Sequence, residues 1–476
     1  MNRFLALLLA SLLLCPAALA EVFIVTYDGS GEASDYSLLL TDDGTALTPP
    51  DTYGRIFRLI PDDAPEEQRR FKAEPAHVSL DLNGADVDEL PWYDYHRVAL
   101  LAADGRQLTG FDYYGLLMMT DGTIAYSVPG SEALLYGAMD RDGNILLEAR
   151  YADLQGMGDG RYLAMLPEGE NAYAVVLADV DGTEKALGLT TDSPILPEPS
   201  QGLCVVNDVL EYGGGSVYID RDGAVRISGT FDRAEPFFGR FARVEVGDHM
   251  GLIDTEGRFA VPPEYDWIFD DSGDIFVAKN GTTLTLLDAN TGEVLMSRDF
   301  GPCEYVDGMV NVPGFLWVCT DQTEYCCRTD GTLLATFEGE DSWTLVNCTP
   351  DAPRLIVFSG EWPEYDARLT DLEGNALSKS YQNLYEDLWR DGEGRYVTTI
   401  MPIITTADGE PTGDWWHSRS GVIDQDGREI LPPVYDEDVV VLAPDRYWVS
   451  TGDKTGMIDG AGHWYYTISN YDALMD

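Results

Sequence analysis

Aspartate-rich turns are the part of this sequence that most resembles a set of metal ligands. The pattern Asp-x-Asp-Gly occurs at Asp140–Gly143, Asp220–Gly223 and Asp424–Gly427. It resembles the first half of a calcium loop, but calcium takes about six to eight oxygen ligands, including a glutamate at loop position 12. That position holds Tyr151, Phe231 and Tyr435. We therefore predict no metal site, and expect the first aspartate to cap its turn by accepting backbone N–H bonds.

Trp415, Trp416 and His417 form a second group with a recognisable chemistry. They follow a loop rich in glycine and proline at residues 407–414. Exposed aromatic rings bind the apolar faces of sugars through flat contacts, so these residues are a candidate patch for a glycan or a protein partner. Packing in the core between neighbouring repeats is the alternative interpretation.

Five cysteines lie close together in the sequence: Cys303, Cys319, Cys326, Cys327 and Cys348. In an exported chain such cysteines can form disulfides, and we predict at least one bond among them. Neighbouring side chains in a strand point to opposite faces, so Cys326 and Cys327 are poor partners, but one of them can bond to Cys319 across a hairpin. Free buried thiols are the alternative. No Cys-x-x-Cys pair is present to bind zinc.

Catalytic signatures are missing from the sequence. It has no Gly-x-Ser-x-Gly or His-Glu-x-x-His motif, no phosphate-binding loop and no Rossmann glycine pattern, and its 5 histidines are scattered. We predict no catalytic residue and no cofactor. An extracellular enzyme that uses carboxylates in a central funnel on polysaccharide or peptide remains an alternative. With 83 acidic residues, some pairs of carboxylates lie by chance at the separation that glycoside hydrolysis needs. The presence of such pairs therefore does not favour an enzyme over a binding module.

The charge and composition exclude several classes of protein. The 476 residues carry a net charge of −53, which repels phosphate backbones and argues against nucleic-acid binding. A hydrophobic content of 45% is too high for a disordered acidic tail. The charge therefore belongs to the surface of a folded protein, and the length favours several domains or an array of repeats.

The first 20 residues have the pattern of a cleaved signal peptide. Arg3 precedes an apolar run at residues 4–14, which is too short to anchor the chain in a bilayer. Residues 18–20 read Ala-Leu-Ala, a small-x-small cleavage site, so we expect a secreted or cell-surface protein that begins at Glu21. Cys15 does not fit a lipidation site, because Leu14 precedes it where a small residue is needed.

Short strand-like runs alternate with glycine turns along the rest of the chain. An Asp-Gly pair between β-forming residues is a strong hairpin signal, because glycine takes the positive φ that a tight turn requires. The main turn glycines are Gly44, Gly105, Gly143, Gly182, Gly223, Gly257, Gly292, Gly331, Gly374, Gly427 and Gly462. From Gly105 onward their spacing of about 40 residues predicts a repeat architecture.

Three segments show the repeat most clearly. Residues 250–266 read MGLIDTEGRFAVPPEYD, residues 420–436 read SGVIDQDGREILPPVYD, and the segment from Thr455 begins TGMIDGAGHW. Each has a Gly-x-Ile-Asp element and a turn, and the first two continue to Pro-Pro-x-Tyr-Asp. Because proline has no N–H, we expect Pro262 and Pro263 to end the strand pairing.

These elements resemble the WG-containing β-repeat family of bacterial proteins, most specifically at residues 235–275 and 417–472. The tryptophan for which the family is named is replaced here by Met250, Ser420 and Thr455. The resemblance implies a fold of repeated β-units, and it implies no particular activity.

We therefore predict an all-β chain of about eleven four-stranded antiparallel units, propeller-like, with a size of about 40 residues per unit. The proline-rich segment 191–201 divides it into an N-terminal β-repeat domain at 21–195 and a C-terminal domain at 203–476. One continuous large propeller or an open β-array is the alternative. The last repeat is short of strands, so we expect residues 464–468 to pair with 22–27 in one ring, with 203–209 in two domains, or to remain an unpaired edge in an open array. Residues 65–74 are the only predicted helix.

Two functions are compatible with this sequence. The favoured one is a secreted or cell-surface binding module that holds a protein or a glycan. The other is the extracellular enzyme described above.

Overall fold

A computed structural model describes the chain from residue 22 to residue 469. The exceptions are 29–34, 60–67, 76–96, 132, 170–171, 230, 272–273, 302, 311, 322, 339–341, 350–351, 361–363, 365, 387–394, 401–402, 406–410, 414–416 and 437–438. The described part contains antiparallel strands and short 3-10 turns such as Leu210–Tyr212, so the all-β prediction is confirmed. It holds no helix with the length and apolar character needed to cross a bilayer.

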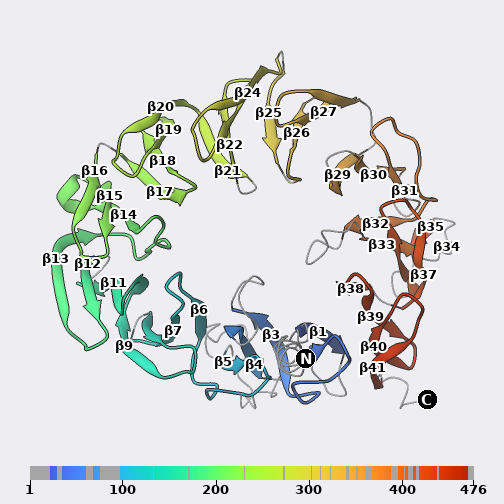
Figure 1. Ribbon diagram of the computed structural model, residues 1–476, viewed down its shortest axis with the longest axis horizontal. Coiled ribbons are helices and arrows are strands. Elements are labelled where there is room, and N and C mark those ends of the chain that lie inside the picture. The colour runs from blue at the N-terminus through green and yellow to red at the C-terminus, as the bar shows by residue number, and fades with distance from the viewer. Residues whose placement is uncertain are drawn as a thin grey trace, which may run out of the picture. The chain divides into compact units, whose positions relative to one another are not determined.

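The N-terminal half contains sixteen strands in three sheets (Figure 1). The first sheet has β1 (Val22–Asp28), β2 (Asp35–Thr41), β3 (Tyr53–Arg58), β4 (Arg70–Pro75) and β5 (Ala99–Ala102). The second has β6 (Gly115–Met118), β7 (Ile124–Pro129), β8 (Leu134–Met139) and β9 (Ile145–Tyr151). The third has β10 (Asp153–Gly158), β11 (Arg161–Pro167), β12 (Tyr173–Asp179), β13 (Glu184–Thr191), β14 (Leu203–Val209), β15 (Gly215–Asp220) and β16 (Val225–Ser228).

The following strands form mostly four-stranded sheets. Three consecutive sheets are β17 (Arg233–Phe238), β18 (Phe241–Val246), β19 (His249–Ile253) and β20 (Phe259–Tyr265); β21 (Trp267–Asp271), β22 (Ile275–Asn280), β23 (Thr283–Asp288) and β24 (Val294–Asp299); and β25 (Val306–Met309), β26 (Phe315–Thr320), β27 (Glu324–Arg328) and β28 (Leu333–Phe337). A three-stranded sheet follows, with β29 (Ser342–Thr349), β30 (Ala352–Ser359) and β31 (Asp366–Thr370).

The remaining strands complete the pattern. β32 (Asn383–Glu386), β33 (Arg395–Ile400), β36 (Arg419–Asp424) and β37 (Glu429–Tyr435) form one sheet, and β34 (Ile403–Thr405) pairs with β35 (Pro411–Gly413). At the C-terminal end β38 (Val440–Ala443) pairs with β39 (Arg446–Thr451), and β40 (Lys454–Ile458) pairs with β41 (Trp464–Ser469).

Contacts divide the chain into two compact units. Unit 1 contains Met1–Leu116, Arg141–Gly143 and Gly452–Asp476, and unit 2 contains Leu117–Asp140 and Asn144–Thr451. The proline-rich segment after β13 lies inside unit 2, where Thr191 of β13 pairs with Val209 of β14 in the third sheet. The two domains expected from the sequence stay a prediction.

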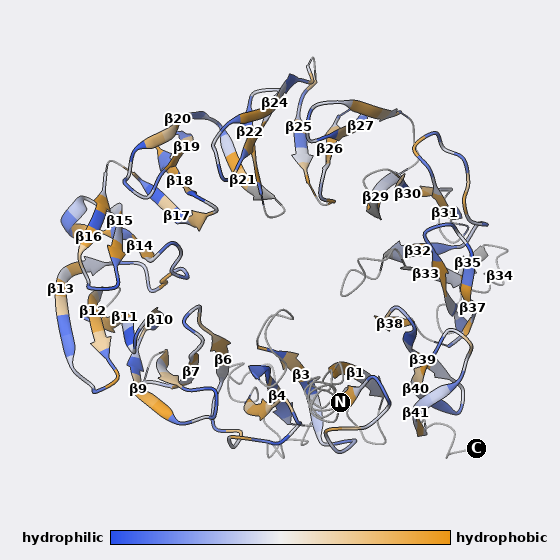
Figure 2. Cartoon of the chain, in the orientation of Figure 1, coloured by the Kyte–Doolittle hydropathy of each residue, from blue (hydrophilic) through white to orange (hydrophobic). Residues whose placement is uncertain are grey.

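The hydrophobic core of unit 2 lies between consecutive sheets. One cluster joins Phe241 and Leu252 of β18 and β19 to Ile268 and Phe276 of the next sheet, and all four are at most 5% exposed. Strands of one sheet differ in their apolar content. In Figure 2, β12 is largely hydrophobic, whereas its neighbour β13 begins with hydrophilic residues. The repeats therefore stabilise one another by face-to-face burial.

The predicted hairpins of the repeat are confirmed. Leu252 pairs with Val261 and Ile253 pairs with Phe259 in the β19–β20 hairpin, and Ile253 is fully buried. The β36–β37 hairpin has the same register, and Ile423 is also fully buried. All eleven main turn glycines have positive φ, as the turn spacing predicts.

Pro262 and Pro263 do not end the pairing, which corrects the sequence expectation. Strand β20 runs through both prolines, and pairing resumes between Met250 and Tyr265 after a bulge. The bulge lies against Gly251, where an added Cβ would be 2.8 Å from both Pro263 N and Val261 O. Because Gly251 has no side chain, the bulged strand that carries Pro262 and Pro263 can lie directly against its backbone. The glycine and the two prolines of the motif therefore act together.

The four strands of one sequence motif do not form one sheet, contrary to the expected unit. Residues 250–265 contribute β19 and β20 to one sheet, and residues 267–280 contribute β21 and β22 to the next. Each motif therefore bridges two consecutive sheets.

The predicted helix at 65–74 is wrong over the part that the structure describes. Strand β4 covers Arg70–Pro75, with Phe71 and Ala73 fully buried between β3 and β5. The alternation of apolar residues in this segment fits a strand, and pairing on both sides overrides the local helix propensity. Residues 65–67 lie outside the described part.

Neither strand exchange expected at the C-terminal end occurs among the described strands. β41 pairs with β40, β1 pairs with β2, and β14 pairs with β13 and β15. Within unit 1, the turn at Gly44 instead packs on the backbone of Tyr465 in β41. The first and last repeats of unit 1 thus meet by turn-to-strand packing.

The bulge generates a stability prediction. Replacing Gly251 by alanine places a methyl group against backbone atoms that cannot move without breaking the hairpin, so we expect a loss of about 1–3 kcal/mol in unfolding free energy. Gly301→Ala is the matched control, because its nearest neighbour would be the side-chain Oγ1 of Thr282 at 3.0 Å. Urea denaturation followed by circular dichroism measures both variants, and equal midpoints would contradict the role assigned to Gly251.

Candidate functional site

A groove in unit 2 is the clearest candidate site in the described part of the chain. It has a volume of about 670 Å³ and lies between the β21–β22 hairpin and the first strand of the next sheet, β25. Its lining residues are Asp266, Trp267, Phe269, Lys279, Tyr305, Val306, Asp307, Gly308 and Met309. The volume is in the range of about 300–1,000 Å³ that holds small ligands in proteins.

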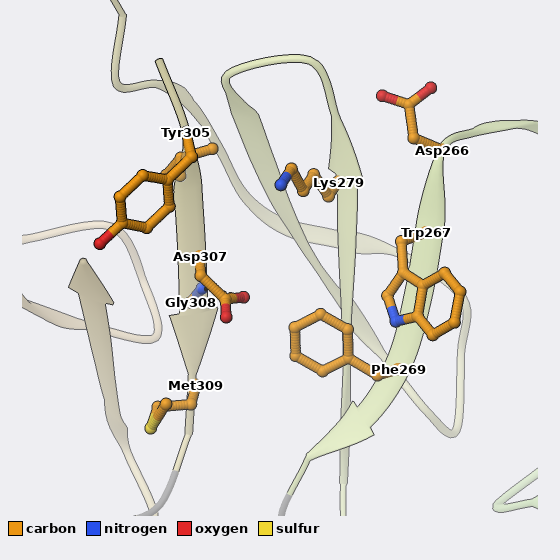
Figure 3. A pocket seen from close by; sticks show the side chains of 9 residues that line it. Asp266, Trp267, Phe269, Lys279, Tyr305, Asp307, Gly308 and Met309 are labelled. Atoms are coloured by element: carbon orange, nitrogen blue, oxygen red, sulfur yellow. Dashed lines mark hydrogen bonds between the residues drawn. The ribbon is translucent and has the colours of Figure 1, made fainter. Parts of the chain in front are cut away.

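Aromatic side chains form two sides of this groove. Figure 3 shows Trp267 and Phe269 from β21 on one side and Tyr305, next to β25, on the other. The side chain of Trp267 is 52% exposed and that of Tyr305 is 49% exposed. Both of these large rings are open to solvent. Trp267 is the first residue of β21 and Tyr305 directly precedes β25, and the residue that follows each of them, Ile268 or Val306, is fully buried.

Polar groups lie between the two aromatic walls. In Figure 3, Lys279 and Asp307 lie between Tyr305 and Trp267. Asp307 Oδ1 accepts a hydrogen bond of 2.9 Å from the N–H of Gly308. The ammonium of Lys279 forms no ion pair with any carboxylate of the described residues. The lining of the groove therefore combines two carboxylates, Asp266 and Asp307, with one ammonium, Lys279, beside the aromatic rings.

Asp266 has a structural role at the rim of the groove. Its Oδ2 accepts a hydrogen bond of 2.7 Å from the N–H of Gly281, in the turn that joins β22 to β23. Asp232 makes the same bond to Gly247 one repeat earlier, also at 2.7 Å. In these two repeats the aspartate that ends the motif therefore caps a hairpin of the following sheet. Asp266 and Asp307 are both exposed.

The aspartates of the main turns cap those turns, as predicted. Asp254 Oδ1 accepts N–H bonds from Glu256 at 3.0 Å and from Arg258 at 2.9 Å. Burial opposes ionisation of Asp254, but these bonds and the Arg258 side chain outweigh it and lower its pKa. Asp220, Asp424 and Asp459 accept the same pair of N–H groups. Among the described residues, no three His, Cys, Asp or Glu side chains come together as a metal site.

The aromatic patch predicted from the sequence is only partly described. Trp415 and Trp416 lie outside the described residues, and His417 is exposed next to β36. Their role as a glycan or partner patch stays a prediction.

Three of the five clustered cysteines, Cys303, Cys319 and Cys327, are free thiols. Cys326 and Cys327 pack into different clusters on opposite faces of β27, as expected for a strand. Cys319 pairs with Glu324, which makes Cys326 a diagonal neighbour beyond disulfide reach. The side chain of Cys348 lies outside the described residues, so a disulfide in this group stays a prediction.

Asp153 is a buried carboxyl group that sequence reasoning did not single out. Its carboxylate accepts N–H bonds of 2.8 Å from Leu154 and from Leu196 in the proline-rich segment, and Gln155 donates to the carbonyl of Leu196. Burial raises the pKa of Asp153 to about 6, against the lowering effect of the two N–H bonds. Leu196 itself is 2% exposed. Asp153 therefore fastens the proline-rich segment to β10.

Asp153 also follows a copy of the motif that the sequence analysis counted only through its turn at Gly143. Residues 136–139 read Tyr-Gly-Ala-Met before the turn at Gly143, and Tyr151 and Asp153 follow. Ala138 pairs with Leu147 and Tyr136 pairs with Tyr151, the same register as β19–β20. Alanine and methionine replace the usual residues before the turn aspartate, and the two prolines are absent, which hides this copy from a motif search.

The groove was missed for a different reason. Trp267 follows the Tyr-Asp of one motif directly, and Tyr305 occupies the corresponding start of the next sheet. Aromatic residues at corresponding positions of neighbouring repeats could have indicated the site, but only if the sheet boundaries had been placed correctly.

The burial of Asp153 generates a pH prediction. Because its folded pKa lies above the ordinary value of 3.8, its contribution to stability is fully present below about pH 4 and is lost as pH rises through about 6. We expect the stability of the native chain, relative to Asp153→Asn, to fall by on the order of 2 kcal/mol between pH 4 and pH 7. Thermal melts across this range measure the difference.

Glu264→Gln is the charge-matched control, because Glu264 is exposed. A difference between Asp153→Asn and the native chain that does not vary with pH would contradict a buried, protonated carboxyl.

Comparisons with solved structures find distant likenesses. A structure described as the eukaryotic initiation factor has a TM-score of 0.39 and 11% identity, covering 67% of this chain and 85% of its own. BamB from Moraxella catarrhalis has a TM-score of 0.26 and 13% identity, covering 60% and 90%. The Cps50 (Swd1) β-propeller domain of Myceliophteria thermophila has a TM-score of 0.23 and 13% identity, covering 50% and 89%. A comparison with curated protein sequences finds no match.

A family model gives the more specific result. The model of the WG-containing repeat matches residues 218–248, 250–281 and 421–441. The second segment contains β19 to β22, including Asp266, Trp267 and Lys279 of the groove. The resemblance stated from the sequence is confirmed at these three segments, which match the model of the WG-containing repeat.

Proposed function

We propose that the protein is a secreted or cell-surface binding module whose ligand occupies the groove between β21–β22 and β25. The repeats supply the scaffold, and the groove supplies the contact surface. The observation that carries this proposal is the pair of half-exposed aromatic side chains, Trp267 and Tyr305, on opposite walls of a groove of about 670 Å³.

The positions of these rings support binding. Large aromatic side chains contribute much of the energy of recognition, and they do so where they can be desolvated in a pocket. Trp267 and Tyr305 come from neighbouring repeats, so the packing between two sheets sets the distance between them. Phe269 and Val306 belong to or contact the shared hydrophobic cluster beneath the groove, which holds the walls in place. A scaffold of this kind presents the rings at little cost in conformational entropy.

Export is part of the proposal and rests on residues 1–20, which lie outside the described part of the chain. If export occurs as proposed, N-terminal sequencing of the protein from the culture medium or the cell surface gives Glu21 as the first residue. Recovery of the protein only inside the cell, beginning at Met1, would contradict export and leave the groove unaffected.

Arrays of immobilised oligosaccharides and peptides test the binding function. The full chain is compared with the double variant Trp267→Ala/Tyr305→Ala, which removes both walls from exposed positions and so leaves the core intact. We expect the double variant to lose at least about ten-fold of its affinity for the ligands that the native chain retains.

Tyr212→Ala is the matched control, because Tyr212 is 41% exposed in the 3-10 turn after β14, away from the groove. Native-like binding by the double variant to every retained ligand would show that the groove is not the binding site.

A further inference from the structure

We propose that the groove binds a basic segment of a partner protein, which places arginine side chains on the rings of Trp267 and Tyr305 and beside the carboxylate of Asp307. The inference rests on the proposed function, because it names the class of partner for the same site. It follows from the acidic segments that form the groove, from two aromatic rings that the chain leaves without a cation, and from the length of one wall.

The segments that form the groove are acidic. Residues 264–274, which contain β21, include five acidic residues and no lysine or arginine, and residues 299–307, which lead into β25, include three acidic residues and no basic one. The lining itself has the exposed carboxylates of Asp266 and Asp307 against the single ammonium of Lys279. In a chain of net charge −53, this excess of carboxylates attracts a basic partner and repels an acidic one.

The exposed rings of the groove lack the cation that covers other rings of this chain. The ammonium of Lys454, for example, lies 4.0 Å from the centre of the Trp464 ring. Among the described residues, no lysine or arginine lies over the ring of Trp267 or Tyr305, although these side chains are 52% and 49% exposed. The two rings are therefore open to a cation from a partner.

Each ring can receive a ligand by itself. Figure 3 shows the rings of Trp267 and Tyr305 over their own strands, so a ligand can cover one ring without reaching the other. A guanidinium group stacks on a single aromatic face, and the N–H groups at its edge remain able to donate to a carboxylate. An arginine therefore suits these rings better than a lysine, whose ammonium acts as a point charge.

Asp307 keeps an oxygen atom for such an arginine. Its Oδ1 accepts the N–H of Gly308 at 2.9 Å, and its Oδ2 accepts no hydrogen bond from a described residue. Tyr305 and Asp307 are two positions apart, so they share one side of the extended chain, and an arginine on the ring can donate to that oxygen. Hydrogen bonds between two charged groups are about twice as strong as those between neutral groups.

The length of the groove favours an extended peptide over a small cation. Five consecutive residues, 305–309, line one wall. They correspond to about 13 Å of extended chain, which matches about four residues of an extended peptide. A single amine would occupy only part of this wall.

Lys279 gives the inference a test of sign. Its ammonium opposes a basic partner and so limits which basic segments can enter the groove. Removal of this ammonium should therefore strengthen the binding of a basic peptide. A neutral or acidic ligand that accepts a hydrogen bond from Lys279 would instead bind more weakly without it.

Isothermal titration of the full chain with three blocked pentapeptides tests the inference. The first is Gly-Arg-Gly-Arg-Gly, in which both side chains lie on one side of an extended backbone. The second has neutral citrulline in place of each arginine, and the third has glutamate. We expect the arginine peptide to bind at least about ten-fold more tightly than the other two, with an affinity that falls at least about five-fold between about 0.05 and 0.5 M NaCl.

Variants distinguish the groove from the rest of the acidic surface. Trp267→Ala and Asp307→Asn should each weaken binding of the arginine peptide at least about five-fold, and asparagine keeps a side-chain oxygen for the backbone N–H that Asp307 caps. Lys279→Met should strengthen binding about two- to five-fold. Asp192→Asn, which removes an exposed carboxylate outside the groove, and Tyr212→Ala should bind like the native chain.

The two proposals fail in distinguishable ways. An arginine peptide that does not bind, or that binds Trp267→Ala and Asp307→Asn as tightly as the native chain, overturns the inference. Binding of the citrulline or glutamate peptide that depends on Trp267, at equal or greater affinity, also overturns it and leaves the groove a binding site. The same holds if acetylarginine amide binds as tightly as the peptide, because a small cation then suffices. If no probe and no ligand on the arrays depends on Trp267, the proposed function fails as well.

Discussion

The capped glycine turn is the constraint on which the rest of the structure depends. In the turn at Gly257, the carboxylate of Asp254 holds two backbone N–H groups and the glycine supplies the positive φ. The same turn packs on Ile227 of the preceding repeat, where a side chain on Gly257 would collide. One short motif thus sets the register of its hairpin and the approach of the neighbouring repeat. This explains why the turns persist where the strands between them have diverged.

The groove is a product of this stacking. Two sheets that meet through Phe269, Leu284 and Val306 must diverge at the edge where their first strands have no further partner among the described strands. Side chains at that edge are neither fully buried nor fully solvated, so they are free to vary without loss of the core. The structure places Trp267 and Tyr305 there, and these large rings are unusual for an edge that only meets water.

Features that depend on local geometry were predictable from the sequence. The hairpin of Ile253, the positive φ of the turn glycines and the capping by Asp254 follow from residues within about ten positions of one another. Features that depend on pairing with residues far away in the sequence could not be predicted from it. Phe71 lies in a strand because β3 and β5 flank it, and a local reading of its segment favours a helix.

The candidate site was beyond sequence reasoning for the same physical reason. Lys279 and Tyr305 are 26 residues apart and belong to different sheets, so their approach depends on how the sheets pack. Trp415 and Trp416 were conspicuous because they are adjacent in the sequence. Asp153 was inconspicuous because its burial comes from Leu196, which is 43 residues away.

The offset between motif and sheet has a consequence for how such chains can grow. A matched segment such as 250–281 supplies the last two strands of one sheet and the first two of the next. When a segment of this length is duplicated in tandem, the new copy therefore completes the sheet before it and begins the one after it. No sheet of the lengthened chain then consists only of the new copy. The hydrogen bond from the N–H of Gly281 to Asp266 links the two sheets that one copy spans. Growth by duplication thus preserves the packing between consecutive sheets at every step.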